Sequence, residues 1–248
     1  MDNSFFILIF VAFAMAAIVA AYMSYQAELR RKAELTQIAA ARGWPFDTSK
    51  DESHPVRYAH FSIFDNGRNC YAYNTVRGAL DVESQSWPMQ FGDYHFETIE
   101  PDGKQTKTQD HVLSYVLIET PYLGLPDLFI REEGFFDKVA GHLGFDDINF
   151  ESAEFSNRFV VTSRDKRFAY DVLHPRMMEF LLDRAPPIID FRRGQCCLNM
   201  GEKCWSVEEF ESVVGWASEF FALWPRHVTS SAAERIEPQL HEEREPLS

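Results

Sequence analysis

Residues 4–25 read SFFILIFVAFAMAAIVAAYMSY, and no charged side chain occurs from residue 3 to residue 27. As an α-helix, these 22 residues would be about 33 Å long, against a hydrocarbon core of about 30 Å. A helix satisfies its own backbone hydrogen bonds, which the interior of a bilayer requires. We therefore predict a transmembrane helix at residues 4–25.

A cleaved signal peptide is the rival interpretation of this stretch. Such peptides begin with basic residues and have an apolar segment of only about 7–15 residues. This chain begins with Met1 and Asp2, and its apolar segment is longer, so we expect a retained anchor. The flanking basic residues follow the segment: Arg30, Arg31 and Lys32. The positive-inside tendency then predicts a single-pass protein of the cell (inner) membrane, with residues 1–3 outside and the C-terminal domain in the cytoplasm.

The rest of the chain divides by composition. Residues 26–43 are predicted to continue as a juxtamembrane helix, which Gly43 would cap and Pro45 would stop. A globular cytoplasmic domain is expected over residues 45–225, as one unit or as two (45–120 and 125–225). Residues 226–248 are polar and acidic without apolar periodicity, which predicts a disordered tail.

Within the domain, the pattern predicts an α+β fold with a mostly antiparallel sheet and several packed helices. Alternation and turn residues indicate strands in the first half, with turns at Asp65-Asn66-Gly67 and Pro101-Asp102-Gly103. Short strands and helices alternate in the second half, and Ser206 with Glu209 forms a capping box. The expected strands are 59–64, 69–77, 89–99, 109–119, 128–130, 159–162, 188–191 and 196–200, and the expected helices are 135–143, 168–173, 176–184 and 206–223.

Charge and cysteine content limit the partners. The net charge of −14, with 38 acidic against 24 basic residues, argues against binding nucleic acid. We expect the bilayer as partner of the N-terminal helix and allow for a protein partner at the cytoplasmic membrane face. In a reducing compartment the four cysteines should stay thiols, and their spacing lacks the ligand pairs of a zinc site. These cysteines are Cys70, Cys196, Cys197 and Cys204.

The second half of the domain also carries a resemblance. Residues 154–165 (EFSNRFVVTSRD), 168–175 (FAYDVLHP) and 178–182 (MEFLL) form a phenylalanine, a short strand, Ser-x-Asp, a helix, Leu-x-Pro and a leucine-rich helix. This pattern resembles a family of prokaryotic membrane-anchored proteins defined by a domain of unknown function, as does Arg42-Gly43-Trp44 after the first helix. The resemblance implies the anchor and the architecture, and no activity or functional residue.

Candidate chemistry is sparse. Asp93, His95 and Glu97 would share one face of a strand, where three such groups can bind a metal, although alternation alone also produces this pattern. His174 with Cys196 or Cys197 is a possible base and nucleophile, against an ordinary role of His174 in capping a helix C-terminus. Solvated acidic residues and serines without a hydrolase motif complete the set: Glu132, Glu133, Asp146, Asp147, Glu151, Ser84, Ser86 and Ser163.

These observations assign no catalytic, cofactor-binding or metal-binding residue, and no cofactor. The leading hypothesis is a membrane-anchored cytoplasmic binding or adaptor domain rather than an enzyme. The first alternative is a membrane-tethered, hydrolase-like enzyme whose site combines scattered residues such as His95, His174 and Cys197. The second is a domain that holds a lipid or another small ligand in a phenylalanine-rich pocket, since 22 residues are phenylalanine.

Overall fold

A computed structural model describes residues 3–102, 105–134 and 147–230 of the chain. The chain divides into two compact units, Met1–Phe46 and Asp47–Ser248. The sequence left open a division of the domain near residue 120. Instead, one sheet runs through both stretches, and residues from 47 onward form one unit.

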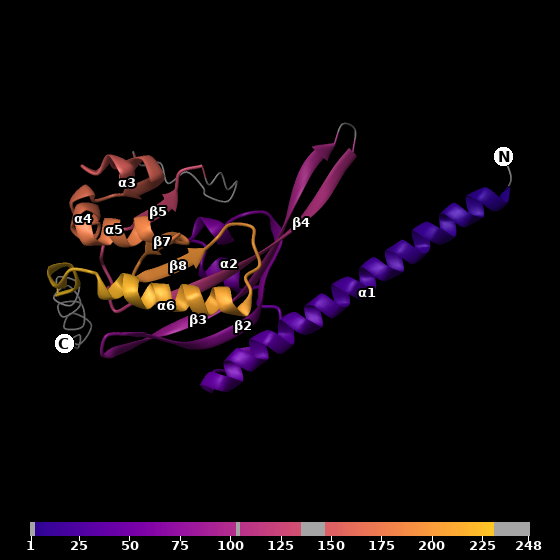
Figure 1. The fold of residues 1–248 in the computed structure, drawn as a ribbon, viewed down its shortest axis with the longest axis horizontal. Coiled ribbons are helices and arrows are strands. Elements are labelled where there is room, and N and C mark those ends of the chain that lie inside the picture. The colour runs from indigo at the N-terminus through magenta and orange to yellow at the C-terminus, as the bar shows by residue number, and fades with distance from the viewer. Residues whose placement is uncertain (1–2, 103–104, 135–146, 231–248) are drawn as a thin grey trace, which may run out of the picture. The chain divides into compact units, whose positions relative to one another are not determined.

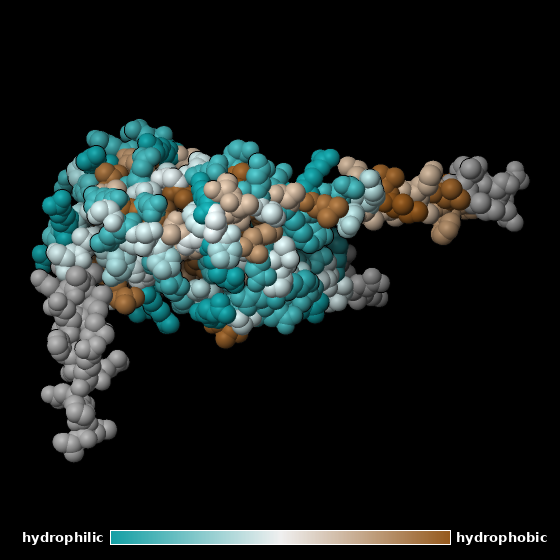
Figure 2. Space-filling model, turned by 90° about the horizontal axis from the view of Figure 1, so that it is seen from below, coloured by the Kyte–Doolittle hydropathy of each residue, from teal (hydrophilic) through white to brown (hydrophobic). Residues whose placement is uncertain are grey.

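The first unit is the helix α1 (Asn3–Arg42). It is continuous through both stretches for which a helix was predicted. It ends at Arg42, and the next residue, Gly43, has a φ of 66°, which glycine adopts without strain. Large apolar side chains between Phe6 and Leu29 are exposed on it, and brown residues gather along this helix in Figure 2. Within the part of the chain that the structure describes, α1 is the one helix long and apolar enough to cross a membrane.

The second unit is built on an eight-stranded sheet in the order β1-β2-β3-β4-β8-β7-β5-β6. Across the sheet, every neighbouring pair from β2 through to the edge strand β6 is antiparallel. The predicted α+β fold with a mostly antiparallel sheet is therefore confirmed. The strands are β1 (Phe46–Asp47), β2 (Arg68–Val82), β3 (Gln85–Asp102), β4 (Gln105–Glu119), β5 (Leu128–Glu132), β6 (Phe159–Ser163), β7 (Ile188–Arg192) and β8 (Gln195–Asn199).

The structure confirms one predicted pair of strands and contradicts another predicted strand. The strands predicted at 188–191 and 196–200 are present as β7 and β8, and a two-residue hairpin at Arg193 and Gly194, with φ of 53° and 75°, joins them. The predicted strand at residues 59–64 is wrong: this segment contains the 3-10 helix η1 (Ser62–Phe64), after the short helix α2 (His54–Arg57). Its aromatic residues pack onto the sheet, and tertiary packing overrides the local strand pattern.

Helices cover both faces of the sheet. Figure 1 shows α6 (Val207–Ala222) lying across the sheet, and its Phe210 and Phe221 contact Phe91 and Trp87 of β3. The predicted Ser206–Glu209 capping box is present at its start. Alternate residues of β3 point to the opposite face, where η1 and α2 bury a cluster around Tyr94, Phe96 and Tyr115.

Three short helices accompany the strands of the second half: α3 (Ala153–Arg158), α4 (Lys166–Val172) and α5 (Pro175–Asp183). The last two confirm the helices predicted near 168–173 and 176–184. The helix predicted at 135–143 lies outside the described residues. The tail was predicted to begin at residue 226, but residues 226–230 are helical and Val228 is buried. The rest of the predicted tail, from residue 231, lies outside the described residues.

The hairpin of β3 and β4 is longer than its neighbours. Pairing of β2 with β3 begins at Arg68 and Glu97, and pairing of β8 with β4 covers only Tyr115–Glu119. Residues 98–102 and 105–109 therefore form a two-stranded ribbon that projects from the sheet (Figure 1). Polar side chains gather at the base of this ribbon.

Candidate functional site

Asp93, His95 and Glu97 occupy alternate positions of β3, as predicted, but only His95 and Glu97 belong to the cluster. Asp93 is buried, accepts hydrogen bonds from Ser114 Oγ (2.7 Å) and Asn74 Nδ2 (3.2 Å), and contributes to the interior of the sheet. Its place beside His95 and Glu97 is taken by Asp110 of β4, which lies directly opposite Glu97. One potential ligand atom from each of these three residues lies within 4.8 Å of the others.

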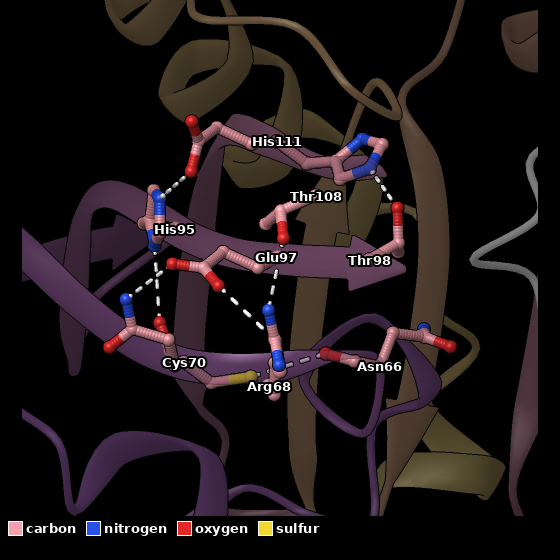
Figure 3. A network of polar contacts seen from close by, with 10 residues as sticks. Asn66, Arg68, Cys70, His95, Glu97, Thr98, Thr108 and His111 are labelled. Atoms are coloured by element: carbon pink, nitrogen blue, oxygen red, sulfur yellow. Dashed lines mark hydrogen bonds and ion pairs between the residues drawn. The ribbon is translucent and has the colours of Figure 1, made fainter. Parts of the chain in front are cut away.

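Hydrogen bonds fix the orientation of His95 (Figure 3). Its Nδ1 lies 3.1 Å from the backbone oxygen of Asn69, and its Nε2 lies 3.3 Å from Oδ1 of Asp110. The ring stacks on Tyr71 of β2, with centroids 4.6 Å apart, and Lys50 Nζ lies 4.0 Å from the Tyr71 centroid. The imidazole therefore has little freedom to rotate.

The carboxylate of Glu97 is held by two residues of β2. Asn69 Nδ2 donates a hydrogen bond to Oε1 (2.7 Å), and Arg68 Nε lies 3.3 Å from Oε2. The Arg68 guanidinium also donates to Thr108 Oγ1 (3.0 Å) on β4 (Figure 3). The side chain of Glu97 is only 19% exposed, whereas that of Asp110 is 73% exposed, so the cluster opens to solvent on the Asp110 side.

A second histidine–carboxylate pair lies on the other face of the same two strands. His111 pairs with Phe96 and stacks on its ring, with centroids 4.6 Å apart. Its Nδ1 lies 2.7 Å from Glu202 Oε2 and its Nε2 lies 2.7 Å from Thr98 Oγ1. Both ring nitrogens of His111 thus have partners, and the side chain is buried.

The residues of the suggested thiol site lie apart. His174 accepts a hydrogen bond from Met177 N at the start of α5, and its Nε2 lies 3.0 Å from the backbone oxygen of Leu223, after α6. It therefore caps the C-terminal end of α6, as its ordinary role predicted, and also the N-terminus of α5. Cys196 and Cys197 are fully buried in β8, and burial raises the pKa of both thiols well above the usual range. A buried, protonated thiol is a poor nucleophile.

Three of the remaining candidates have structural partners. Glu132 forms an ion pair with Arg158 at 3.0 Å, while Asp146 lies outside the described residues. Ser86 Oγ donates to Asp81 Oδ1 (2.8 Å) and Ser163 Oγ donates to the Asp127 backbone oxygen (2.6 Å). Neither serine has a histidine as hydrogen-bond partner among these contacts.

Two hollows differ in size and character. A cavity of about 160 Å³ beside Tyr58 is too small for a lipid chain, since small-molecule sites usually measure about 300–1,000 Å³. Burial and the nearby carboxylate of Glu119 raise the pKa of Tyr58 there. A wider hollow of about 460 Å³ is bordered by aromatic rings, including Trp87, Tyr122 and Trp224.

Sequence reasoning missed Asp110, Asn69 and Arg68. The available signal was the hairpin itself, because any turn near residue 103 brings residues around 97 and 110 together. However, Glu97 meets Asp110 on one face only if the register is correct to the residue, and a shift by one places Asp110 on the other face. The predicted turn at 101–103 did not specify that register.

No protein-family model matches the chain, and no curated protein sequence matches it. Among solved structures, it is similar to the crystal structure of the mycobacterial trehalose monomycolate transport factor A, TtfA. The TM-score is 0.49 and the sequence identity 11%, and the match covers 79% of this chain and 96% of that chain. Because a likeness at this level does not extend to function, the functional argument rests on the residues of this chain.

Proposed function

We propose that this chain is a single-pass membrane protein whose residues from 47 onward act as a cytoplasmic binding domain for a protein partner. The observation that carries the anchor is the exposure of large apolar side chains on α1, such as Phe10, Phe13 and Ile18. A soluble helix buries one apolar stripe, whereas a helix that is apolar around its circumference is stable in lipid.

The orientation follows from charge. Arg30, Arg31 and Lys32 come directly after the apolar segment, and Asp2 precedes it. Basic flanks favour the cytoplasmic side, which supports a cytoplasmic domain and an external N-terminus. Membership of the prokaryotic membrane-anchored family stays a prediction that agrees with this arrangement.

Binding is favoured over catalysis by the positions of the reactive side chains. His95, His174 and Cys197 occupy separate surroundings: the ribbon base, a helix junction and the buried middle of β8. One exposed face that combines an aromatic ring with charged groups lies around Lys50, Tyr71 and Asp110. Aromatic residues with polar neighbours are typical of protein-binding surfaces.

The anchor is tested by fractionation and a C-terminal fluorescent fusion. The full chain should stay in membranes after alkaline extraction, and a green fluorescent protein fused after Ser248 should fluoresce, as it does in the cytoplasm. Replacing Arg30, Arg31 and Lys32 by glutamate should reduce that fluorescence. Release of the full chain by alkali would contradict the anchor, and a dark fusion made in normal amounts would contradict the orientation.

The binding face is tested by photocrosslinking in intact membranes. A photoreactive phenylalanine analogue at Tyr71 should give one reproducible crosslinked species, and the charge change Lys50→Glu should weaken it. The matched control is the same analogue at Tyr170, an exposed tyrosine on α4. Equal products from both positions, or none from Tyr71, would contradict a partner on this face.

A second candidate function is small-ligand binding in the wider hollow. Tyr122 stacks on Trp224 with centroids 5.6 Å apart, and Trp87 meets Tyr122 edge-on at 5.3 Å. Such a wall of rings suits a flat or apolar ligand. Native mass spectrometry of the purified full chain should then show a copurifying molecule that Tyr122→Ala removes, and an unliganded mass would count against this function.

A further inference from the structure

We propose that His95, Glu97 and Asp110 bind a divalent transition-metal ion of the Zn²⁺ type at the base of the β3–β4 ribbon. This metal site goes beyond the proposed binding function and does not depend on it. Three observations carry the proposal: the hydrogen bonding of the His95 ring, the spacing of the ligand atoms, and the way in which Asn69 holds two of the three ligands.

The ring of His95 presents Nε2 to a carboxylate. The backbone oxygen of Asn69 can only accept a hydrogen bond, so Nδ1 of His95, 3.1 Å away, carries a proton. In a neutral ring, Nε2 then has a lone pair, and it lies 3.3 Å from Oδ1 of Asp110, which is also an acceptor. Two acceptors this close need a cation between them, either a proton or a metal ion.

The distance fits a metal ion. At metal–ligand bonds of about 2.0–2.1 Å and tetrahedral angles, two ligand atoms lie about 3.3–3.4 Å apart. The observed Nε2–Oδ1 separation is 3.3 Å. A carboxylate oxygen of Glu97 completes a group of three ligand atoms that all lie within 4.8 Å of one another, so the group must contract around a bound ion. Three protein ligands leave at least one position for water or another ligand.

Asn69 orients two of the ligands. Its backbone oxygen holds Nδ1 of His95, and its side-chain Nδ2 holds Oε1 of Glu97. Metal-binding histidines are commonly fixed in this way through the nitrogen that does not face the metal. Asn69 has a φ of 51°, and the β2–β3 register shifts between Arg68 and Tyr71. Bulges and left-handed residues often occur where side chains are redirected at functional sites.

The ligand set indicates the class of ion. One imidazole with two carboxylates suits Zn²⁺, Mn²⁺ or Fe²⁺, whereas Mg²⁺ and Ca²⁺ favour oxygen ligands alone. Two carboxylates also compensate the charge of a divalent ion. Among the described residues, the His111–Glu202 pair has no second carboxylate that could act as a third ligand, and His111 lies between Glu202 and the Thr98 hydroxyl. It is therefore the natural internal control.

The test is calorimetric titration of the full chain in detergent micelles, without a histidine tag, after treatment with a chelator. Zn²⁺ should bind at one site per chain and Mg²⁺ should not compete. Asp110→Asn and His95→Gln should each weaken Zn²⁺ binding by about 100-fold or abolish it. Asn69→Gly, which keeps the positive φ but removes the amide, should weaken it by about 10-fold. The control Glu202→Gln should leave it unchanged.

Co²⁺ provides an independent readout. Bound at this site, it should give visible d–d absorption without a thiolate charge-transfer band, since no cysteine takes part. Melting temperatures of the variants establish that they are folded. The proposal is overturned if Zn²⁺ does not bind the wild-type chain, if it binds equally well to Asp110→Asn and His95→Gln, or if the Co²⁺ spectrum shows thiolate ligation.

Discussion

The two faces of the β3–β4 hairpin carry the same pair of groups with different surroundings. On the covered face, His111 lies 2.7 Å from Glu202, stacks on buried Phe96 and bonds to Thr98. On the open face, His95 lies 3.3 Å from Asp110, stacks on Tyr71 and has Glu97 as a third group. The comparison teaches that a buried histidine with one carboxylate partner contributes to the fold, whereas a histidine beside two carboxylates, one of them largely exposed, is a candidate site.

The largest expected difference concerns the rings beneath the two histidines. Phe96 is 1% exposed, so Phe96→Ala should lower the free energy of unfolding by about 3–5 kcal/mol. Tyr71 is only half-buried, and Tyr71→Ala should cost about 1 kcal/mol. Urea denaturation of both variants measures the two changes in the free energy of unfolding. Equal losses would contradict the distinction between a structural face and an open face.

A second prediction uses His54, which is buried on the covered face against Phe64, Tyr94 and Tyr115. Burial lowers the pKa of His54 from 6.5 to about 3. Between these pH values the unfolded chain takes up a proton that the folded chain does not, so stability falls as the pH drops below 6.5. From pH 6.5 to 4.5, this loss should be about 2–3 kcal/mol.

The variant His54→Gln isolates that contribution. Because glutamine does not titrate, the free energy of unfolding of the variant should depend less steeply on pH over this range than that of the wild type. Denaturation curves at several pH values provide the measurement. Parallel pH profiles for the two proteins would show that His54 is accessible to protons in the folded state.

The histidines themselves should differ by a smaller amount. His111→Ala removes a stacked ring and leaves Glu202 and Thr98 without their partner, which should cost about 1–3 kcal/mol. His95→Ala removes a partly exposed ring and should cost less than about 1 kcal/mol in metal-free buffer. Thermal melts with and without Zn²⁺ sharpen the comparison, since only His95→Ala should lose the stabilisation by the metal.

The smallest expected effect is at the rim of the open face. Arg68 is half-exposed beside Glu97, so Arg68→Ala should change the free energy of unfolding by about 0–1 kcal/mol and less in high salt. Removing this positive charge should also tighten Zn²⁺ binding, by up to about 10-fold. Weaker binding in the variant would instead identify Arg68 as a residue that positions Glu97.

Local signals in the sequence predicted most elements of the fold. The capping box at Ser206 and the helices predicted near 168–173 and 176–184 depend on neighbouring residues, and the structure contains all three. The segment 59–64 was predicted incorrectly as a strand. Its aromatic residues instead pack against the face of the sheet, and this long-range packing cannot be seen in the local pattern. The candidate site was partly predicted: His95 and Glu97 belong to it, whereas Asp93 on the same face is bonded to Ser114 and Asn74, and Asp110 was missed.

By itself, the sequence determined the apolar helix and the absence of a familiar catalytic motif, because both depend on contiguous residues. Tertiary structure decided the rest. Asp110 reaches Glu97 only through the hairpin register, and Asn69 reaches both His95 and Glu97 only through an irregularity in β2. His174 meets Leu223 across 49 residues of sequence. Such contacts arise from long-range pairing and packing, whose energies are collective and leave no signature in the spacing of residues.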